Sequence, residues 1–158
     1  MTRPTENSDG VMPFTLYIRV RYGECDPQQV VFNARYGDYV DLAMSEFFRA
    51  IFGAWQKMLD RGLDCQVVRL LTEWQHPARF DDVLALQVAT QAVGNTSFRI
   101  GVTMLRANDG QAIATAEASY VLVNTSDYRK TPVPQDLRER LLAGAPGVEV
   151  DHAAWCAK

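Results

Sequence analysis

Residues 33–59 read NARYGDYVDLAMSEFFRAIFGAWQKML, and this stretch decides the fold. Its apolar side chains recur three or four positions apart, which is the spacing of one face of a helix. The pattern predicts a helix over residues 34–59, with Asn33 as its N-cap and a length of about 39 Å, unless Gly53 ends it early. Because the apolar face is wide, we expect other parts of the chain to wrap around it. The side chains of that face are Tyr36, Val40, Met44, Phe47, Ile51, Trp55 and Met58.

The segments on either side of this helix are rich in apolar side chains, and those over residues 14–22, 83–93 and 98–104 alternate between apolar and polar side chains, which predicts half-buried strands. One such segment precedes the helix and four follow it: 14–22, 65–74, 83–93, 98–104 and 111–124. Turn signals at residues 94–95 and 108–110 leave short connections, which favour antiparallel pairing of the four later strands in a meander. A short helix is predicted over residues 135–142. This order predicts an α+β fold in which an antiparallel sheet of about five strands wraps around one long central helix.

The chain has 158 residues, the length of one domain. We predict a flexible lead over residues 1–12, a single domain over residues 13–143 and a tail over residues 144–158. The net charge of -3, without a run of Lys and Arg, argues against a general nucleic-acid binder. Three cysteines and two histidines lack the spacing of metal ligands, so we expect no metal site. With no apolar signal segment and no apolar stretch of about 18 residues, we expect a cytoplasmic protein without membrane contact.

The loop before the long helix places a carboxylate, Asp26, close to backbone N–H groups that have no partner within the helix. Such donors can polarise a carbonyl oxygen, and a nearby carboxylate can attack the carbonyl carbon or activate a water molecule. The same residues have a simpler interpretation, because Asp-Pro before a helix commonly forms only a turn. From the residue pattern alone, both interpretations stay open.

The stretch VRYGECDPQQVVF at residues 20–32, followed by Tyr36 and Asp41, resembles the hotdog-fold thioesterases. The resemblance is closest to the 4-hydroxybenzoyl-CoA thioesterase family. The stretch HPARFDDVL at residues 76–84 is similar to that family's Asp-Asp entry into its next strand. Weaker matches extend the resemblance over roughly residues 14–142, in the same order as the elements predicted above.

The resemblance implies a hotdog fold and the hydrolysis of an acyl-CoA thioester to a free acid and CoA, without a cofactor. By the same resemblance, Asp26 is the nucleophile or the general base. The backbone N–H of Asn33 is the donor that polarises the thioester carbonyl. Hotdog subunits pair edge to edge and build their active sites between them, so we expect a homo-oligomer, either a dimer or a tetramer.

Further candidates for substrate binding are Tyr36 and Asp41 in the helix and the basic pair Arg129 and Lys130 after the last strand. Simpler interpretations exist for several of them, since Tyr36 fits the core and the basic pair fits an exposed surface. Gln29 stands where the family has a glycine. Because glycine lets the backbone pass close to a ligand, we expect Gln29 to narrow or reshape the acyl entrance.

Other carriers and functions remain as alternatives. Residues 93–96 lack the basic side chains with which one branch of the family holds the CoA phosphates, so acyl carrier protein is an alternative carrier. A non-catalytic acyl-thioester binding module is the second function considered, and a hotdog dehydratase or hydratase ranks below it. The dehydratases resemble one another in an Asp and His pair, and no histidine lies near Asp26 in the sequence. We interpret Cys25 as a small buried thiol and His76 as structural.

Overall fold

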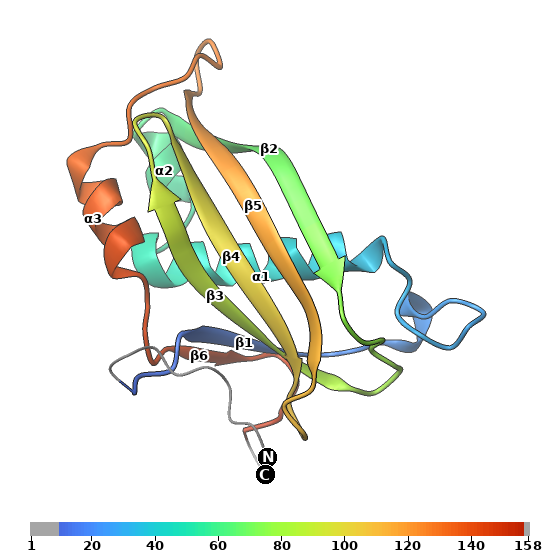
Figure 1. The fold of residues 1–158 in the computed structure, drawn as a ribbon. Helices are drawn as coiled ribbons and strands as arrows, with labels where there is room; N and C mark the ends of the chain where they lie inside the picture. Colours follow the sequence, from blue (N-terminus) through green and yellow to red (C-terminus); the bar gives the residue numbers. More distant parts are fainter. Residues whose placement is uncertain (1–9, 157–158) are drawn as a thin grey trace.

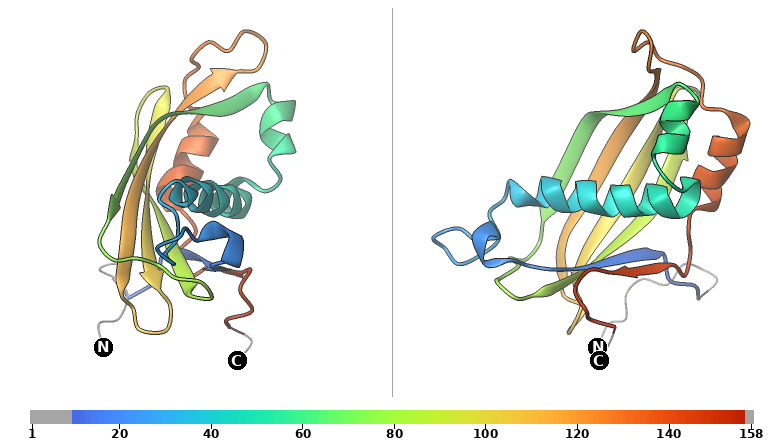
Figure 2. Two further views of the ribbon diagram at one scale, coloured as in Figure 1. Left: turned by 90° about the vertical axis from the view of Figure 1, so that its right-hand side faces the viewer. Right: turned by 180° about the vertical axis from the view of Figure 1, so that it is seen from behind.

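A computed structural model of the chain describes residues 10–156, and its main element is one curved sheet (Figure 1). The strands follow the order β2-β5-β4-β3-β1-β6. Helices α1 (Arg35–Phe52), α2 (Gln56–Asp60) and α3 (Gln135–Ala143) lie on one side of this sheet, as Figure 2 shows. Among the described residues, no helix is both long and apolar enough to cross a membrane. The strands are β1 (Phe14–Arg19), β2 (Leu63–Trp74), β3 (Val83–Val93), β4 (Ser97–Arg106), β5 (Ala112–Asn124) and β6 (Glu149–Asp151).

Helix α1 crosses the concave face of the sheet and supplies the centre of the core (Figure 2). Nine of its 18 residues are buried. The ring of Phe47 is fully buried and meets the ring of Phe14 from β1 edge-on, with 5.6 Å between the centroids. Burying one side chain of this size contributes about 3 kcal/mol. The predicted α+β fold, with a sheet wrapped around one long helix, is confirmed.

The helix predicted over residues 34–59 is divided into α1 and α2. Gly53 ends α1 with a φ of 81°, and its N–H donates to the carbonyl of Arg49 at 2.9 Å. Glycine adopts this left-handed backbone without steric cost, so the chain turns before α2 begins. Helix α1 starts at Arg35, and its N-cap residue is Ala34, without a side-chain cap. The prediction of Asn33 as the N-cap is therefore wrong.

The four strands after α1 do not form one meander, which corrects the sequence prediction. Strands β3, β4 and β5 pair through antiparallel hairpins as expected. Strand β2 instead pairs with β5, and β1 pairs with β3. The connection over residues 75–82 therefore crosses from one edge of the β3-β4-β5 unit to the other. Because β1 and β2 lie on opposite sides of that unit, α1 spans the sheet between them.

A sixth strand, β6, pairs in parallel with β1 and covers that edge of the sheet. Part of the segment assigned to a tail thus belongs to the sheet. The carboxylate of Asp151 accepts hydrogen bonds from the backbone N–H groups of Ala153, Trp155 and Cys156 at 2.9, 3.1 and 2.8 Å. The guanidinium of Arg19 donates to the carbonyl of Ala153 at 3.1 Å. These contacts hold the C-terminal segment against β1. Residues 1–9 of the expected flexible lead lie outside the described residues.

The opposite edge of the sheet, formed by the 12 residues of β2, pairs with no other strand in the described part of the chain. An open edge presents backbone groups that can pair with another strand. Several large apolar side chains accompany it at 42% exposure or more: Val67, Val68, Leu70, Leu71 and Trp74. The two edges of the sheet therefore differ, since β6 covers one edge and no described residue pairs with the other.

Replacing Asp151 by Ala removes an acceptor that three backbone N–H groups share. We expect the melting temperature to fall by roughly 2–4 °C, because β6 then separates from β1 more easily. Asp127→Ala is the control, since the carboxylate of Asp127 accepts one backbone N–H, that of Arg129, at 3.0 Å. Thermal unfolding followed by circular dichroism measures both variants. Equal shifts would contradict a special role of Asp151 at this edge.

Candidate active site

The segment around Asp26 forms a small hairpin beyond the N-terminal end of α1 (Figure 1). The N–H of Asp26 donates to the carbonyl of Val30, and the N–H of Phe32 donates to the carbonyl of Glu24, both at 2.9 Å. Across the tip, the N–H of Gln29 donates to the carbonyl of Asp26 at 2.8 Å. These bonds fix the backbone that positions the Asp26 side chain.

Asp26 lines a cavity of about 510 Å³. Its Oδ1 accepts a hydrogen bond from the backbone N–H of Gln28 at 2.8 Å, which is the expected turn stabilised by the aspartate side chain. Within residues 10–156, its Oδ2 has no hydrogen-bond or ion-pair partner. One carboxylate oxygen therefore holds the turn, and the other is available to a ligand or a water molecule.

Two aromatic side chains that the sequence analysis did not select line the same cavity. Tyr22 and Phe80 meet edge-on, with 5.8 Å between the ring centroids and an angle of 87° between the planes. The Tyr22 side chain is 82% exposed, so much of its apolar ring faces solvent. Tyr22 stands four residues before Asp26 within the quoted motif, and that proximity was the available signal. Phe80 comes from the β2–β3 connection and could not be placed there from the sequence.

Gln29 also lines the Asp26 cavity, and its backbone has a φ of 63°. Glycine adopts this left-handed conformation most readily. The glycine expected at this position is thus explained by the backbone itself and not only by close approach to a ligand. That Gln29 narrows an acyl entrance stays a prediction.

Asn33 and Tyr36 line a second cavity, of about 250 Å³, rather than the one that contains Asp26. The ring of Trp74, at the end of β2, meets the ring of Tyr36 edge-on at 5.8 Å. The N–H of Asn33 donates no hydrogen bond to any residue in the described part of the chain. It lies next to the N-cap of α1, where the helix dipole presents partial positive charge. Asn33 is an exposed residue, and its backbone N–H is therefore proposed as a donor to an incoming oxygen.

His76 lines the second cavity as well, although the sequence analysis assigned it a structural role. Its Nδ1 lies 3.0 Å from the carbonyl oxygen of Ala112 and 2.9 Å from the amide nitrogen of Gln111. These contacts tie the imidazole to the start of β5, which agrees with the structural interpretation. Cys25 is only partly buried, and its Sγ donates a long 4.0 Å contact to the carbonyl of Arg21.

Asp41 lines a third cavity, of about 320 Å³, between α1 and the start of β2. Aromatic walls come from Phe48, Trp55 and Tyr120. Burial, followed by the charge of Asp41, raises the pKa of the Tyr120 hydroxyl, which is therefore a neutral donor at physiological pH. Burial raises the pKa of Cys65 to about 12. Its thiol thus stays protonated near neutral pH and is a poor nucleophile.

Arg129 and Lys130 are exposed and lie after β5, at the end of the sheet where β2 begins. Trp74 marks the other end of β2, beside the cavity that contains Asn33. A strand of 12 residues spans roughly 40 Å. Within one chain, the basic pair is therefore far from the Asp26 hairpin. The guanidinium of Arg129 lies 3.8 Å from the carboxylate of Asp127.

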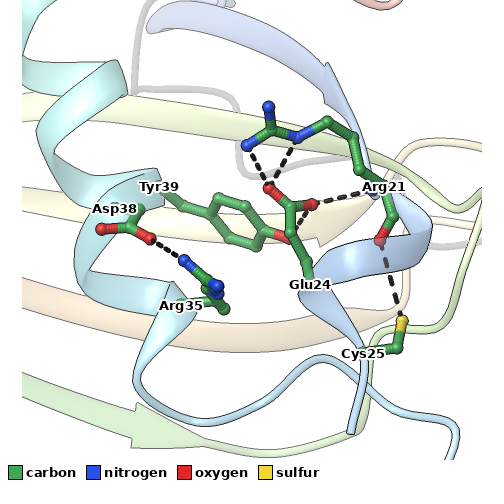
Figure 3. A network of polar contacts seen from close by, with 6 residues as sticks. All are labelled: Arg21, Glu24, Cys25, Arg35, Asp38 and Tyr39. Carbon is green, nitrogen blue, oxygen red and sulfur yellow. Dashed lines mark hydrogen bonds and ion pairs between the residues drawn. The ribbon is translucent and has the colours of Figure 1, made fainter.

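Glu24, which was not selected from the sequence, is a buried acid within the motif over residues 20–32, with 6% exposure. Its Oε2 accepts hydrogen bonds from the backbone N–H of Arg21 and from the hydroxyl of Tyr39, both at 2.8 Å. Its Oε1 accepts Nε and Nη2 of Arg21 at 3.0 and 2.8 Å (Figure 3). Burial alone would raise the pKa of Glu24, but these hydrogen bonds outweigh it and hold the pKa below its ordinary value of 4.5. Glu24 is therefore ionised at neutral pH.

Comparison with known proteins finds one family. The family model described as "Thioesterase-like superfamily" matches residues 20–141. The acyl-CoA thioester hydrolase YbgC of Escherichia coli O6:H1 is 24% identical over 120 residues, which cover 76% of this chain and 89% of the relative. A crystal structure of a hypothetical protein from Aquifex aeolicus superposes with a TM-score of 0.75 at 25% identity and covers 82% of this chain and 99% of its own. A 1,4-dihydroxy-2-naphthoyl-CoA thioesterase from Synechocystis shares the fold, with a TM-score of 0.74 at 19% identity over 81% of this chain and 94% of its own.

Gln29→Gly should raise the free energy of unfolding by up to about 1 kcal/mol. A left-handed backbone costs a residue with a side chain roughly 1–2 kcal/mol, and the greater freedom of glycine in the unfolded chain offsets part of the gain. The control is Gln28→Gly, because the neighbouring exposed glutamine does not have a positive φ. Gln28→Gly should destabilise the protein. Urea denaturation of both variants makes the comparison, and a loss of stability in Gln29→Gly would contradict the backbone argument.

Proposed function

Since the chain belongs to the thioesterase-like superfamily and is a thioesterase by its relatives, we propose that it hydrolyses an acyl-CoA thioester with Asp26 as its catalytic carboxylate. The resemblance to hotdog-fold thioesterases is confirmed for family and fold. The observation that best supports the role of Asp26 is its placement. A half-buried carboxylate with one unoccupied oxygen lines a cavity, on a hairpin that leads directly into α1.

Two chemical routes are open to Asp26. As a nucleophile, its oxygen attacks the thioester carbon and displaces the CoA thiolate, which takes up a proton, and water then hydrolyses the acyl anhydride. As a general base, Asp26 takes a proton from the water that attacks the same carbon, and a proton returns to the departing thiolate. Both routes yield the free acid and the CoA thiol. Both place negative charge on the carbonyl oxygen, for which the N–H of Asn33 is the proposed donor.

The three cavities supply one site only when two chains combine. A two-fold axis that joins two β2 edges makes them antiparallel, so the start of β2 lies opposite the end of its partner. The cavity beside Asp41 includes Cys65 and Val67 from the start of β2, whereas the cavity of Asn33 includes Trp74 from the end. Such a dimer brings the Asp41 cavity of one chain next to the Asn33 cavity of the other. We therefore assign the active site to the interface between subunits.

In this arrangement, the cavity beside Asp41 is the proposed acyl pocket. A volume of about 320 Å³ with aromatic walls suits an aromatic or short acyl group better than a long chain. Arg129 and Lys130 also lie near the start of β2. In the proposed dimer they therefore lie near the end of the partner's β2 strand, on the side of the partner's Asp26 hairpin. Their charges suit the phosphates of CoA, and an acidic carrier protein is the alternative occupant.

Asp26→Asn should lower kcat by at least ~10²-fold, because the amide can neither attack the thioester nor accept a proton. The amide oxygen still accepts the N–H of Gln28, so the melting temperature should change little. The substrate is the best thioester from a panel of aryl-, short-, medium- and long-chain acyl-CoA, with thiol release as the readout.

Asp109→Asn is the matched control for that substitution. The carboxylate of Asp109 accepts the N–H of Gln111 at 3.0 Å in the same local geometry, in the hairpin between β4 and β5. It should retain wild-type turnover. An Asp26→Asn protein with most of its turnover would remove Asp26 from the mechanism. Tight binding without thiol release from any acyl-CoA or acyl carrier protein would favour the non-catalytic binding module.

Leu70→Lys should convert the wild-type oligomer to a monomer of 17.7 kDa and weaken self-association by at least ~10²-fold. Leu70 lies on the α1 side of the open edge, where a Cβ added to Gly37 would lie 3.9 Å from the leucine side chain. A lysine there stays half exposed in one chain but is buried without a partner when two edges meet. Leu142→Lys is the control, since Leu142 is an exposed leucine of α3. Analytical ultracentrifugation measures the oligomeric state of the wild type and of both variants. A monomeric wild type would contradict an active site shared between two subunits.

A further inference from the structure

The Glu24 carboxylate contacts more of the surrounding structure than any other acid near the hairpin. It is the one carboxylate side chain buried within residues 10–156. Four donor groups from Arg21 and Tyr39 reach its two oxygens at 2.8–3.0 Å (Figure 3). Removing a carboxylate from water is costly unless its hydrogen bonds are replaced, and here they are replaced in full. Nothing in the proposed chemistry uses Glu24 directly.

These contacts join three separate segments. Arg21 is the N-cap and Glu24 the last residue of the single turn of 3-10 helix that follows β1 and leads into the hairpin. Tyr39 lies one turn inside α1, is 1% exposed, and donates its hydroxyl to the Glu24 carboxylate. The carbonyl of Glu24 accepts the N–H of Phe32, which closes the base of the hairpin. The backbone carbonyl of Glu24 thus closes the hairpin, and its side chain connects the hairpin to α1.

We propose that Glu24 is a positioning residue, whose carboxylate is held by Arg21 and fixes the Asp26 hairpin to α1 through Tyr39. The inference rests on the proposed function of Asp26. The carboxylate of Asp26 and the N–H of Asn33 lie on opposite sides of the Glu24–Phe32 hydrogen bond along the chain. Their relative placement depends on the angle between hairpin and helix, and the Tyr39–Glu24 bond restrains that angle. A displacement of about 1 Å between reacting groups can lower turnover ~10²-fold.

The connection that Glu24 makes between the hairpin and α1 also depends on pH. The pKa of Glu24 is below its ordinary value in the folded protein, so ionised Glu24 stabilises the fold above pH 4.5. This contribution is lost as the pH falls through the folded-state pKa. The hydroxyl of Tyr39 is one of the groups that lower that pKa. Without the hydroxyl, Glu24 takes up a proton at a higher pH.

Tyr39→Phe is the test, because it removes one hydrogen bond and leaves the ring in the core. The Arg21 donors still satisfy both oxygens of Glu24, so the protein should fold. We expect kcat to fall ~10-fold or more while KM changes less than about 3-fold, as for a loss of alignment rather than of binding. The acid limb of the pH–rate profile should move to higher pH.

Tyr17→Phe is the matched control. The hydroxyl of Tyr17 donates to the carboxylate of Glu149 at 3.2 Å, between β1 and β6 and away from the hairpin. It should leave kcat and the pH profile unchanged. If Tyr39→Phe lowers the melting temperature but retains both kcat and the acid limb, Glu24 is only structural and the inference is wrong. Asp26→Asn in the same assay separates the two ideas. An active Asp26→Asn protein overturns the proposed function, whereas an inactive one beside an unaffected Tyr39→Phe overturns only the role of Glu24.

Discussion

The burial of the apolar face of α1 is the constraint on which the rest of the structure depends. A helix with nine buried residues needs apolar contact over a wide arc, and a flat sheet would cover only part of it. The sheet curves around α1 and places the rings of Phe14 and Phe47 in contact at the centre. Because α1 is fixed in this way, its N-terminal end is held still at the rim of the sheet. The Asp26 hairpin is attached at that end.

The same packing determines which sheet edge can meet another molecule. Strand β6 covers the β1 edge, and the carboxylate of Asp151 secures the turn that follows it. Within residues 10–156 the β2 edge has no such cover and exposes apolar side chains, so it is the edge at which we propose that the sheet is extended by a partner. An edge used by two identical strands closes at a dimer and does not propagate. The single chain therefore has separate cavities, and the proposed active site requires two chains.

The hairpin itself is held by polar contacts rather than by a core. Asp26, Gln28 and Gln29 are exposed or half-buried, and backbone hydrogen bonds close the loop. The left-handed backbone of Gln29 is strain that this loop tolerates. Glu24 is the point at which the polar loop is joined to the apolar core, through the hydroxyl of Tyr39. The buried carboxylate of Glu24 therefore both stabilises the fold and, in our proposal, aligns the Asp26 hairpin with α1.

The sequence by itself determined the elements whose signals are local. Periodicity along residues 34–59 identified the central helix but not its end at Phe52, apolar patterning between turn signals identified five strands, and the motif around Asp26 identified the family. What required the tertiary structure was non-local pairing. Strand β2 pairs with β5, from which two other strands separate it in the sequence. Residues 149–151 are too short a stretch for the alternation of apolar and polar side chains to predict a strand, and they form β6 by pairing in parallel with β1. Glu24 was missed for the same reason, since its partner Tyr39 is 15 positions away. Helix and strand propensities and residue spacing depend on neighbouring residues, so they can be predicted from the sequence. The order of strands in the sheet, the burial of a charged side chain and the relative positions of the cavities depend on contacts between distant segments, so they required the tertiary structure.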